Sequence, residues 1–558
     1  MPRHVWKQWG AAGLSAGLLE LPFPLAGPLP PWRSVFAWFG LAPLIWAILS
    51  PGTMESPRPM RRAFLLSYVC GFLWYMGNCY WVRDTMSRYG DMPALAPILL
   101  LIGFSLVLGL YFGLFGLGMM AVRRATGSAR LALVAAPFLW VALDLLGARF
   151  TSVPWDQLGY SQVDNGLVST LAPWTGVYGI TFILVVANAA LLGCLVNVAR
   201  RTSLIALASI FPFLFIVDLL TTPLKPLPAD ATAVLVQPNL DVGGENNWSG
   251  PGEWEGHIAA FTRLAEEQCK TYIAGIPQTG APNGEVVCPP YVTHSDLVVW
   301  PEAPAPYEKA DPRFQQSVAS VAKSVGAPLV VGGIGMEYST DEQRWRDYNS
   351  AMLFGMDGKA MGRYNKIHLV PFGEFVPFEK LLFFAKKLTG NVGRFDRGTD
   401  RTPFRIADQS GNEHRYGVFI CYEAVFADEV RHFARNGAEV LVNISDDGWY
   451  GDTSAPWQHL NMARMRAIEN RRWLLRDTNN GITAAIDPYG RVRQSIPRHQ
   501  ADALPAQYGF RSDVTFYSAH GDVFAWACAI LCLGVLAWCV NRIQRTAAAG
   551  VQVQVKVR

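Results

Sequence analysis

Hydrophobic positions form long, nearly unbroken runs in the first 220 residues and once more near the C-terminus. A helix needs about 20 mostly apolar residues to cross a hydrocarbon core of ~30 Å. The pattern predicts a multi-pass α-helical membrane domain whose first span is weakened by Glu20, Pro22 and Pro24. A cleaved signal peptide followed by seven spans is the alternative. The eight candidate stretches are residues 11–26, 34–50, 63–82, 94–120, 131–147, 168–198, 203–220 and 522–541.

The pattern changes between residues 221 and 521, where short runs of Val, Ile and Leu alternate with helical stretches. Such runs are typical of strands buried on both faces. The alternation predicts an α/β layered domain. Predicted strands are 233–237, 296–300, 328–333, 417–420 and 439–444, and predicted helices are 258–267, 313–325 and 459–476. The expected organisation is about seven spans in 1–220, a soluble domain in 221–521, a last span in 522–541 and a basic cytoplasmic tail in 542–558.

Composition narrows the class of protein. Of 558 residues, 51% are hydrophobic and only 16% are charged, whereas soluble domains carry about a quarter charged residues. This excludes an ordinary soluble enzyme and a disordered chain. A formal net charge of +4 gives little electrostatic support for nucleic-acid binding.

Basic side chains predict the orientation in the membrane. They gather in alternate loops and in the C-terminal tail, and such loops face the cytoplasm. The 221–521 domain is therefore expected on the periplasmic side of the inner membrane. The basic residues are Arg3 and Lys7, then Arg58, Arg61 and Arg62, then Arg123, Arg124 and Arg130, then Arg200 and Arg201, and finally Arg542, Arg545, Lys556 and Arg558.

Two reactive side chains follow buried runs of the α/β domain. Glu302 comes two residues after one run and Cys421 directly after another. Ligand sites of α/β sheets lie beyond the carboxyl ends of strands, so these two side chains are expected in one crevice. A disulfide between Cys269 and Cys288 would leave Cys421 as the free thiol of the domain.

These residue types suit covalent acyl chemistry. A thiol attacks as thiolate and needs a base. Glu302, beside Trp300 in a poorly hydrated site, is expected to have a raised pKa and to act as that base. Lys366 and the backbone N–H of Tyr422 are candidates for stabilising the oxyanion.

Three motifs occur in this order along the chain: Trp300-Pro301-Glu302-Ala303, the run from Tyr364 to Glu374, and Ile420-Cys421-Tyr422-Glu423. This set resembles the carbon–nitrogen hydrolase (nitrilase) superfamily, which implies an α-β-β-α sandwich and a Glu-Lys-Cys triad. With the membrane spans, the chain resembles the apolipoprotein N-acyltransferase family of that superfamily. Further matching runs are Phe375–Pro377, Trp457–His459, Met462–Ala467 and Thr478–Thr483.

The resemblance implies roles and a reaction. Glu302 would be the general base, Lys366 the stabilising cation and Cys421 the nucleophile. A fatty acyl chain would pass from a membrane phospholipid through a cysteine thioester to the N-terminal α-amine of a diacylglyceryl-cysteine apolipoprotein, the last step of lipoprotein maturation. Supporting active-site positions are Glu374, Tyr422 and Glu423, and substrate-binding candidates are Trp248 and Trp254.

Other features refine this hypothesis. Scattered histidines predict no metal site, and no cofactor, no nucleic-acid partner and a monomer are expected. The apolar run Leu381–Phe384, before Lys386 and Lys387, predicts a membrane-facing lid. Asp446-Asp447 and a long loop at 270–290 depart from the family pattern.

Two other functions stay open at this point. A membrane-tethered amidase would share the same triad and pass the acyl group to water. A transporter or receptor would need charged residues inside the spans, and Asp144 and Asp218 are the few candidates.

Overall fold

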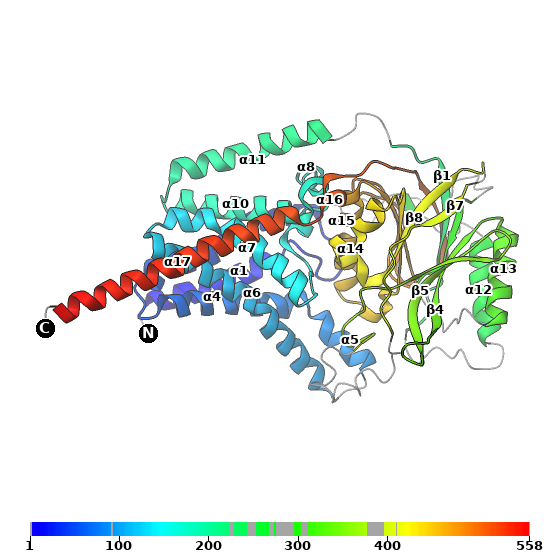
Figure 1. The fold of residues 1–558 in the computed structure, drawn as a ribbon, viewed down its shortest axis with the longest axis horizontal. Helices are drawn as coiled ribbons and strands as arrows, with labels where there is room; N and C mark the ends of the chain where they lie inside the picture. Colours follow the sequence, from blue (N-terminus) through cyan, green and yellow to red (C-terminus); the bar gives the residue numbers. More distant parts are fainter. Residues whose placement is uncertain are drawn as a thin grey trace. The chain divides into compact units, whose positions relative to one another are not determined.

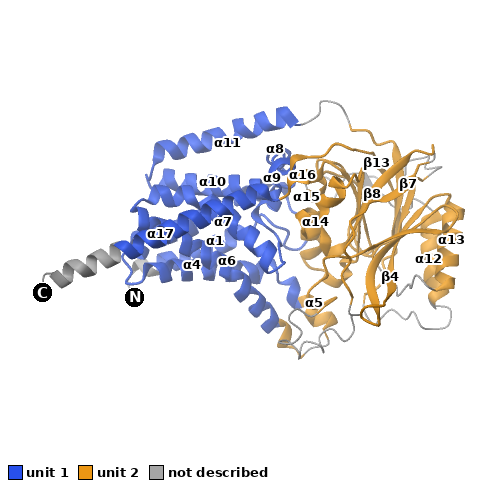
Figure 2. Cartoon of the chain, in the orientation of Figure 1, with its two compact units in different colours: residues 1–83, 98–222, 522–558 blue, residues 84–97, 223–521 orange. Residues whose placement is uncertain are grey.

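A computed structural model describes residues 3–90, 93–221, 227–242, 253–266, 273–274, 295–302, 311–375, 395–408 and 410–556. The chain forms two compact units, coloured separately in Figure 2. One contains Met1–Arg83, Ile98–Thr222 and Asp522–Arg558, and is helical. The other contains Asp84–Pro97 and Pro223–Gly521, and holds both β-sheets.

The helical unit is built from long apolar helices joined by short turns (Figure 1). The helix η1 (Pro31–Trp38) ends just before α2 (Ala42–Leu49) begins, and backbone groups between two helices lack helical hydrogen-bond partners. The side chain of Asn188, on α10 (Val177–Leu195), accepts from the N–H groups of Leu41 and Ala42 and donates to the Ala37 carbonyl. The elements are α1 (Arg3–Glu20), η1 (Pro31–Trp38), α2 (Ala42–Leu49), α3 (Pro51–Met54), α4 (Pro59–Asn78), α6 (Ala96–Thr126), α7 (Ala129–Phe150), η2 (Leu158–Gln162), α8 (Gly166–Ser169), α9 (Ala172–Thr175), α10 (Val177–Leu195), α11 (Arg200–Thr221) and α17 (Val523–Lys556). The helix α5 (Trp81–Tyr89) belongs to the other unit from Asp84 onward.

Six helical segments in the described part of the chain are long and apolar enough to cross a membrane. Large apolar side chains of α11, including Phe213 and Phe215, are about half exposed or more, as expected for a surface that contacts lipid. These segments overlap six of the eight predicted spans, and the other two predicted spans overlap α1 and α4. The six are Pro31–Leu49, Ala96–Thr126, Ala129–Phe150, Val177–Leu195, Arg200–Thr221 and Val523–Arg545.

Two predicted spans have different bounds in the structure. The first begins at Arg3 and ends at Glu20, because Pro22 and Pro24 cannot continue the helix. The sixth is not continuous: Gly176, with φ of 63°, separates α9 from α10, a left-handed conformation that glycine adopts readily.

The second unit contains two β-sheets. Their strand orders are β13-β1-β3-β4-β5-β6 and β2-β12-β11-β10-β9-β8-β7. In the first sheet β1, β3 and β4 are parallel, and in the second β8, β9 and β10 are parallel. The strands are β1 (Ala231–Gln237), β2 (Ile273–Ala274), β3 (Leu297–Val299), β4 (Leu329–Ser339), β5 (Arg344–Phe354), β6 (Ala360–Asn365), β7 (Phe404–Ala407), β8 (Glu413–Ile420), β9 (Val440–Ser445), β10 (Trp473–Thr478), β11 (Thr483–Ile486), β12 (Val492–Ile496) and β13 (Asp502–Tyr508).

Helices cover the outer face of each sheet, which gives the predicted α-β-β-α sandwich. Phe261 of α12 and Phe314 of α13 pack with Val298 and Trp300 in one core. The sheets face each other, and Tyr416 of one meets Tyr508 of the other through their hydroxyl groups at 2.8 Å. The helical elements are α12 (Glu253–Glu266), α13 (Pro312–Val325), η4 (Cys421–Val425), α14 (Ala427–Arg435), η5 (Asp447–Tyr450), α15 (Ala455–Asn470) and α16 (Phe516–His520).

The predicted helix at 459–476 is wrong in its second part. α15 ends at Asn470, Arg471 is left-handed with φ of 51°, and β10 follows. Arg472 and Arg476 lie in this second part, and both are fully buried. Arg472 donates to the Ala438 carbonyl, and Arg476 pairs with Asp447.

Candidate active site

The candidate residues come from the ends of strands in both sheets. Glu302 follows β3 and Lys366 follows β6 in the first sheet, whereas Cys421 follows β8 and Asp446 follows β9 in the second. Cys421 has a left-handed backbone with φ of 49°, which is uncommon for a residue with a side chain. Such strain is typical of functional positions held by their surroundings.

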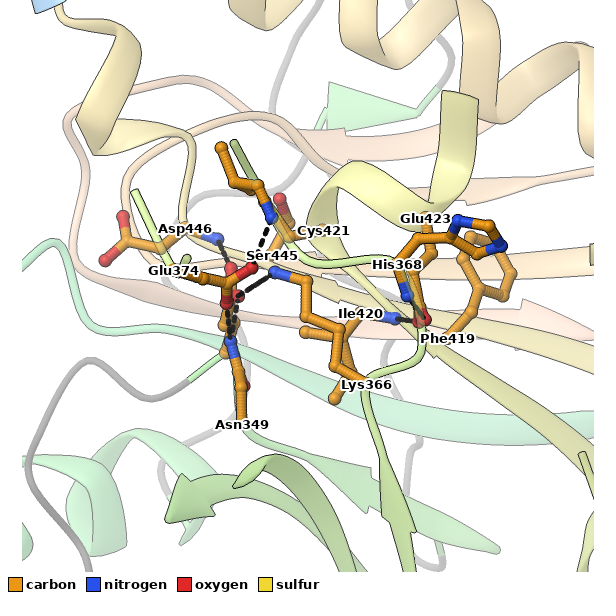
Figure 3. A network of polar contacts seen from close by, with 12 residues as sticks. Asn349, Lys366, His368, Glu374, Phe419, Ile420, Cys421, Glu423, Ser445 and Asp446 are labelled. Atoms are coloured by element: carbon orange, nitrogen blue, oxygen red, sulfur yellow. Dashed lines mark hydrogen bonds and ion pairs between the residues drawn. The ribbon is translucent and has the colours of Figure 1, made fainter. Parts of the chain in front are cut away.

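A buried ion cluster surrounds Lys366 (Figure 3). Its Nζ lies 2.9 Å from Glu302 Oε1 and 3.0 Å from Glu374 Oε1. Asn349 of β5 donates from Nδ2 to the same two oxygens, at 2.7 Å each. The backbone N–H of Asp446 donates to Glu302 Oε2 at 3.0 Å. One ammonium is therefore shared by two carboxyl groups, and Lys366, Asn349 and the Asp446 N–H together restrain the orientation of Glu302.

The charges in this cluster decide the protonation states. Burial opposes ionisation of Glu302, but Lys366 and the hydrogen bonds from Lys366, Asn349 and Cys421 outweigh it, so the pKa of Glu302 falls below its ordinary value. Burial opposes the Lys366 ammonium too, yet Glu302, Glu374 and Cys421 hold its pKa well above the ordinary value. The prediction of a raised pKa for Glu302 is wrong, because it considered burial without the neighbouring cation.

The Cys421 thiol behaves in the opposite way. Burial and the charge of Glu302 raise its pKa well above the ordinary value, and Lys366 offsets part of that rise. The resting site at neutral pH thus holds a carboxylate, an ammonium and an unionised thiol. This arrangement suits a thiol that loses its proton to Glu302 as it attacks.

Glu423 ties the Lys366 segment to the Cys421 segment. One carboxylate oxygen accepts from the Ile367 and His368 N–H groups at 2.7 and 3.1 Å, and the other from the Ile420 N–H at 2.7 Å. The Tyr364 hydroxyl donates to both oxygens at 2.8 Å. Glu423 is completely buried, so its contacts hold the two segments together.

A second chain of polar contacts holds the backbone at Cys421. His459 of α15 donates from Nε2 to the Cys421 carbonyl at 3.0 Å. Its Nδ1 lies 3.0 Å from Asp447 Oδ1 and 3.1 Å from an Arg476 nitrogen. Ser445 donates to Asp447 Oδ1 at 2.9 Å. These side chains are fully buried, which anchors the strained Cys421 backbone to the second sheet.

Asp446 is a third carboxyl group near Glu302. Its side chain accepts from the Gly448 N–H at 3.0 Å and from Asn479 at 3.2 Å. Burial, reinforced by the charge of Glu302, raises the pKa of Asp446 to about 8. The sequence departure at this position therefore places a titratable group beside the proposed base.

The rings of two predicted residues make contacts with residues outside the ion cluster. Trp254 of α12 packs against the hydrophobic core, and the Arg313 guanidinium lies 4.7 Å from its ring centre. The Tyr422 ring packs on Phe426, 5.3 Å between ring centres. Trp248, Cys269, Cys288 and the predicted lid at 381–387 lie outside the described residues.

The place of Asn349 in the site and the contact between His459 and Cys421 were not predicted from the sequence. Asn349 lies in the buried part of β5. The only indication in the sequence was an amide side chain within a stretch that forms a buried strand. His459 is one of the histidines for which no metal site is predicted, and its contact with the Cys421 carbonyl shows which part of the structure it supports.

Comparisons with known proteins agree with these observations. The apolipoprotein N-acyltransferase N-terminal domain matches residues 15–190 and the carbon-nitrogen hydrolase family matches residues 263–506. The apolipoprotein N-acyltransferase of Geobacter metallireducens is 34% identical, covering 93% of this chain and 92% of that protein. That of Pseudomonas putida is 31% identical, covering 96% and 97%. Among solved structures, an amidase from Nesterenkonia sp. is 15% identical with a TM-score of 0.34, covering 55% of this chain and 99% of that chain. The chain belongs to the apolipoprotein N-acyltransferase family.

Proposed function

We propose that this enzyme moves a fatty acyl chain from a membrane phospholipid to Cys421 and then to the N-terminal α-amine of a diacylglyceryl-cysteine apolipoprotein. The observation that carries the proposal is the convergence of a thiol, a carboxylate and an ammonium in one buried cluster. Both substrates are lipid-anchored, which accounts for joining this site to membrane helices. Relatives that cover nearly the whole chain support N-acyl transfer over hydrolysis.

In the first half-reaction, Glu302 accepts the Cys421 proton while the sulfur attacks the ester carbonyl carbon of the phospholipid. Negative charge develops on the carbonyl oxygen, and we assign its stabilisation to the Lys366 ammonium and the Tyr422 N–H. The ester C–O bond then breaks. The departing lysophospholipid oxygen takes the proton from Glu302, and a thioester remains on Cys421.

In the second half-reaction, the unprotonated α-amine attacks the thioester carbonyl carbon. Glu302 accepts a proton from the attacking nitrogen and returns one to the Cys421 sulfur as the C–S bond breaks. The cycle regenerates all three groups and is a ping-pong mechanism. Glu374 positions Lys366, and Glu423 positions both loops.

We place the catalytic unit on the periplasmic side of the inner membrane. The support is the alternation of basic loops along the chain, which favours a cytoplasmic position for those loops. Lipoprotein substrates anchored in the outer leaflet would then reach Cys421 without crossing the bilayer. We further propose a monomer, because the three reactive groups all come from one chain.

An assay with two lipid substrates tests the proposal. The full-length protein in detergent receives a phospholipid with a labelled acyl chain and a diacylated lipopeptide with a free N-terminus. We expect the label on the lipopeptide, and an N-acetylated lipopeptide is the matched control that accepts none. Labelled free fatty acid without labelled peptide would instead identify a hydrolase.

His459 is expected to position Cys421 without contacting substrate. His459→Asn should lower kcat about tenfold with KM changed less than twofold, because the Cys421 carbonyl loses its donor. His459→Gln can place an amide N–H where Nε2 lies and should recover most of kcat. Steady-state kinetics on both variants checks this. Equal losses in both would argue against the positioning role.

The pH profile should report Asp446. Above about pH 8 its carboxylate adds negative charge beside Glu302 and disfavours the oxyanion, so wild-type kcat should fall there by up to about tenfold. Asp446→Asn should keep its activity at alkaline pH.

The same group should affect stability. Because the pKa of Asp446 is raised in the folded state, the free energy of unfolding should fall as pH rises towards 8 in the wild type, but not in Asp446→Asn. Asp452→Asn, at an exposed carboxylate of the same segment, is the control. An unchanged alkaline limb in Asp446→Asn would contradict the assignment.

A further inference from the structure

The helical unit contains a cavity of about 50 Å³ that the proposed mechanism does not use. Its walls are largely aromatic, with Trp74 and Tyr75 from α4, Trp140 from α7, and Trp155 from the loop that follows. The rings pack against each other, Trp74 on Tyr75 at 4.6 Å between ring centres. Asp144 and Asp156 also line the cavity.

The carboxyl groups of Asp144 and Asp156 are incompletely satisfied. Asp156 is 1% exposed; Asn78 donates to its Oδ2 at 3.0 Å, and its Oδ1 has no hydrogen-bond partner among the described residues. Asp144 Oδ2, on α7, likewise has none there. Glu20 lies within electrostatic reach of Asp156 and of Arg33, and neither of its carboxyl oxygens has a hydrogen-bond partner among the described residues. Orphaned carboxylate oxygens in an apolar unit cost free energy unless a donor satisfies them.

The surroundings favour an organic cation over a metal ion. The described residues contain no group of three His, Cys, Asp or Glu side chains arranged to hold a metal. Aromatic faces attract ammonium groups through their quadrupole, and a primary ammonium offers three N–H donors to carboxylate oxygens. A quaternary ammonium offers none. A group the size of a water molecule needs about 10–15 Å³ of cavity volume. The cavity of about 50 Å³ therefore has room for an ammonium group and the methylene attached to it.

We propose that this cavity binds the primary ammonium group of a membrane lipid, with Asp156 and Asp144 accepting its hydrogen bonds and the aromatic rings enclosing it. Two lipids supply that chemistry: an aminophospholipid through its headgroup and a diacylated lipopeptide through its N-terminus. The proposal concerns binding in the helical unit and does not depend on the reaction at Cys421. It gives a donor to the oxygens of Asp144 and Asp156 that have no hydrogen-bond partner among the described residues.

The test measures lipid binding without turnover. Full-length protein carrying Cys421→Ala is delipidated in detergent and titrated with chain-matched phosphatidylethanolamine, phosphatidylcholine or phosphatidylglycerol, and with a diacylated lipopeptide or its N-acetylated form. Bound lipid is counted by native mass spectrometry. We expect a preference of about tenfold for one primary-amine lipid over its matched partners. A preference among phospholipids identifies the headgroup, and a preference between lipopeptides identifies the N-terminus.

Matched variants locate the site. Asp156→Asn keeps the shape of the side chain and should abolish the preference, and Asp144→Asn should weaken it. Glu55→Gln removes an exposed carboxylate of the same unit and should leave the preference intact. If Asp156→Asn is poorly folded by thermal melting, Asp144→Asn serves as the deciding variant. A wild type that binds all these lipids equally, or a folded Asp156→Asn with the full preference, would overturn the proposal.

Discussion

Replacing Cys421 by alanine is expected to abolish N-acylation, by at least about four orders of magnitude, while the protein folds and inserts normally. The thiol is the proposed acyl carrier, and no other group in the ion cluster can form a thioester. Cys421 is buried beside Glu302 and Lys366, and losing one sulfur atom leaves their salt bridge in place. Cys421→Ser keeps a nucleophilic atom but should be nearly as inactive, because the hydroxyl is harder to deprotonate.

The measurement that accompanies this variant is direct detection of the intermediate. Wild-type protein incubated with phospholipid alone should carry one acyl chain on the peptide that contains Cys421, and adding lipopeptide should remove it. The alanine variant should carry none. An acyl chain on a different residue, or near-normal turnover by Cys421→Ala, would contradict the assigned nucleophile.

Lys366→Met is expected to lower activity by about 10³-fold or more and to destabilise the fold by about 3–5 kcal/mol. The substitution leaves Glu302 and Glu374 buried without their shared cation. Burial then acts on Glu302 without its main opposing charge, so its pKa should rise above the ordinary value. The pH at which Glu302 becomes ionised, visible as the acidic limb of kcat, should move upward.

A double variant separates the two effects of Lys366. Adding Glu374→Gln to Lys366→Met removes one of the two uncompensated charges and keeps a hydrogen-bonding side chain of the same size. Thermal and denaturant unfolding should show most of the lost stability restored, whereas activity should stay low because the cation is still missing. Recovery of activity together with stability would mean that Lys366 serves the fold and not the reaction.

Much of this architecture could be predicted from local patterns. Apolar runs long enough to span a membrane and short Val- and Leu-rich strands reflect the solvent that surrounds each segment, a property of the residues themselves. Glu302, Lys366 and Cys421 could be found because they follow strand ends within recognisable motifs. The prediction that the helix continues beyond Asn470 is wrong, because buried arginines in a strand look, in the sequence, like the polar face of a helix.

The sequence by itself determined the class of protein, a helical membrane unit joined to an α/β sandwich, and it indicated the candidate side chains of the site. The tertiary structure decided their protonation states and supports. The pKa of Glu302 depends on an ammonium 64 positions away in the chain, and the Cys421 backbone depends on His459 from another helix. Electrostatic and hydrogen-bond energies depend on distance in space, and the local pattern of a chain contains no such distances.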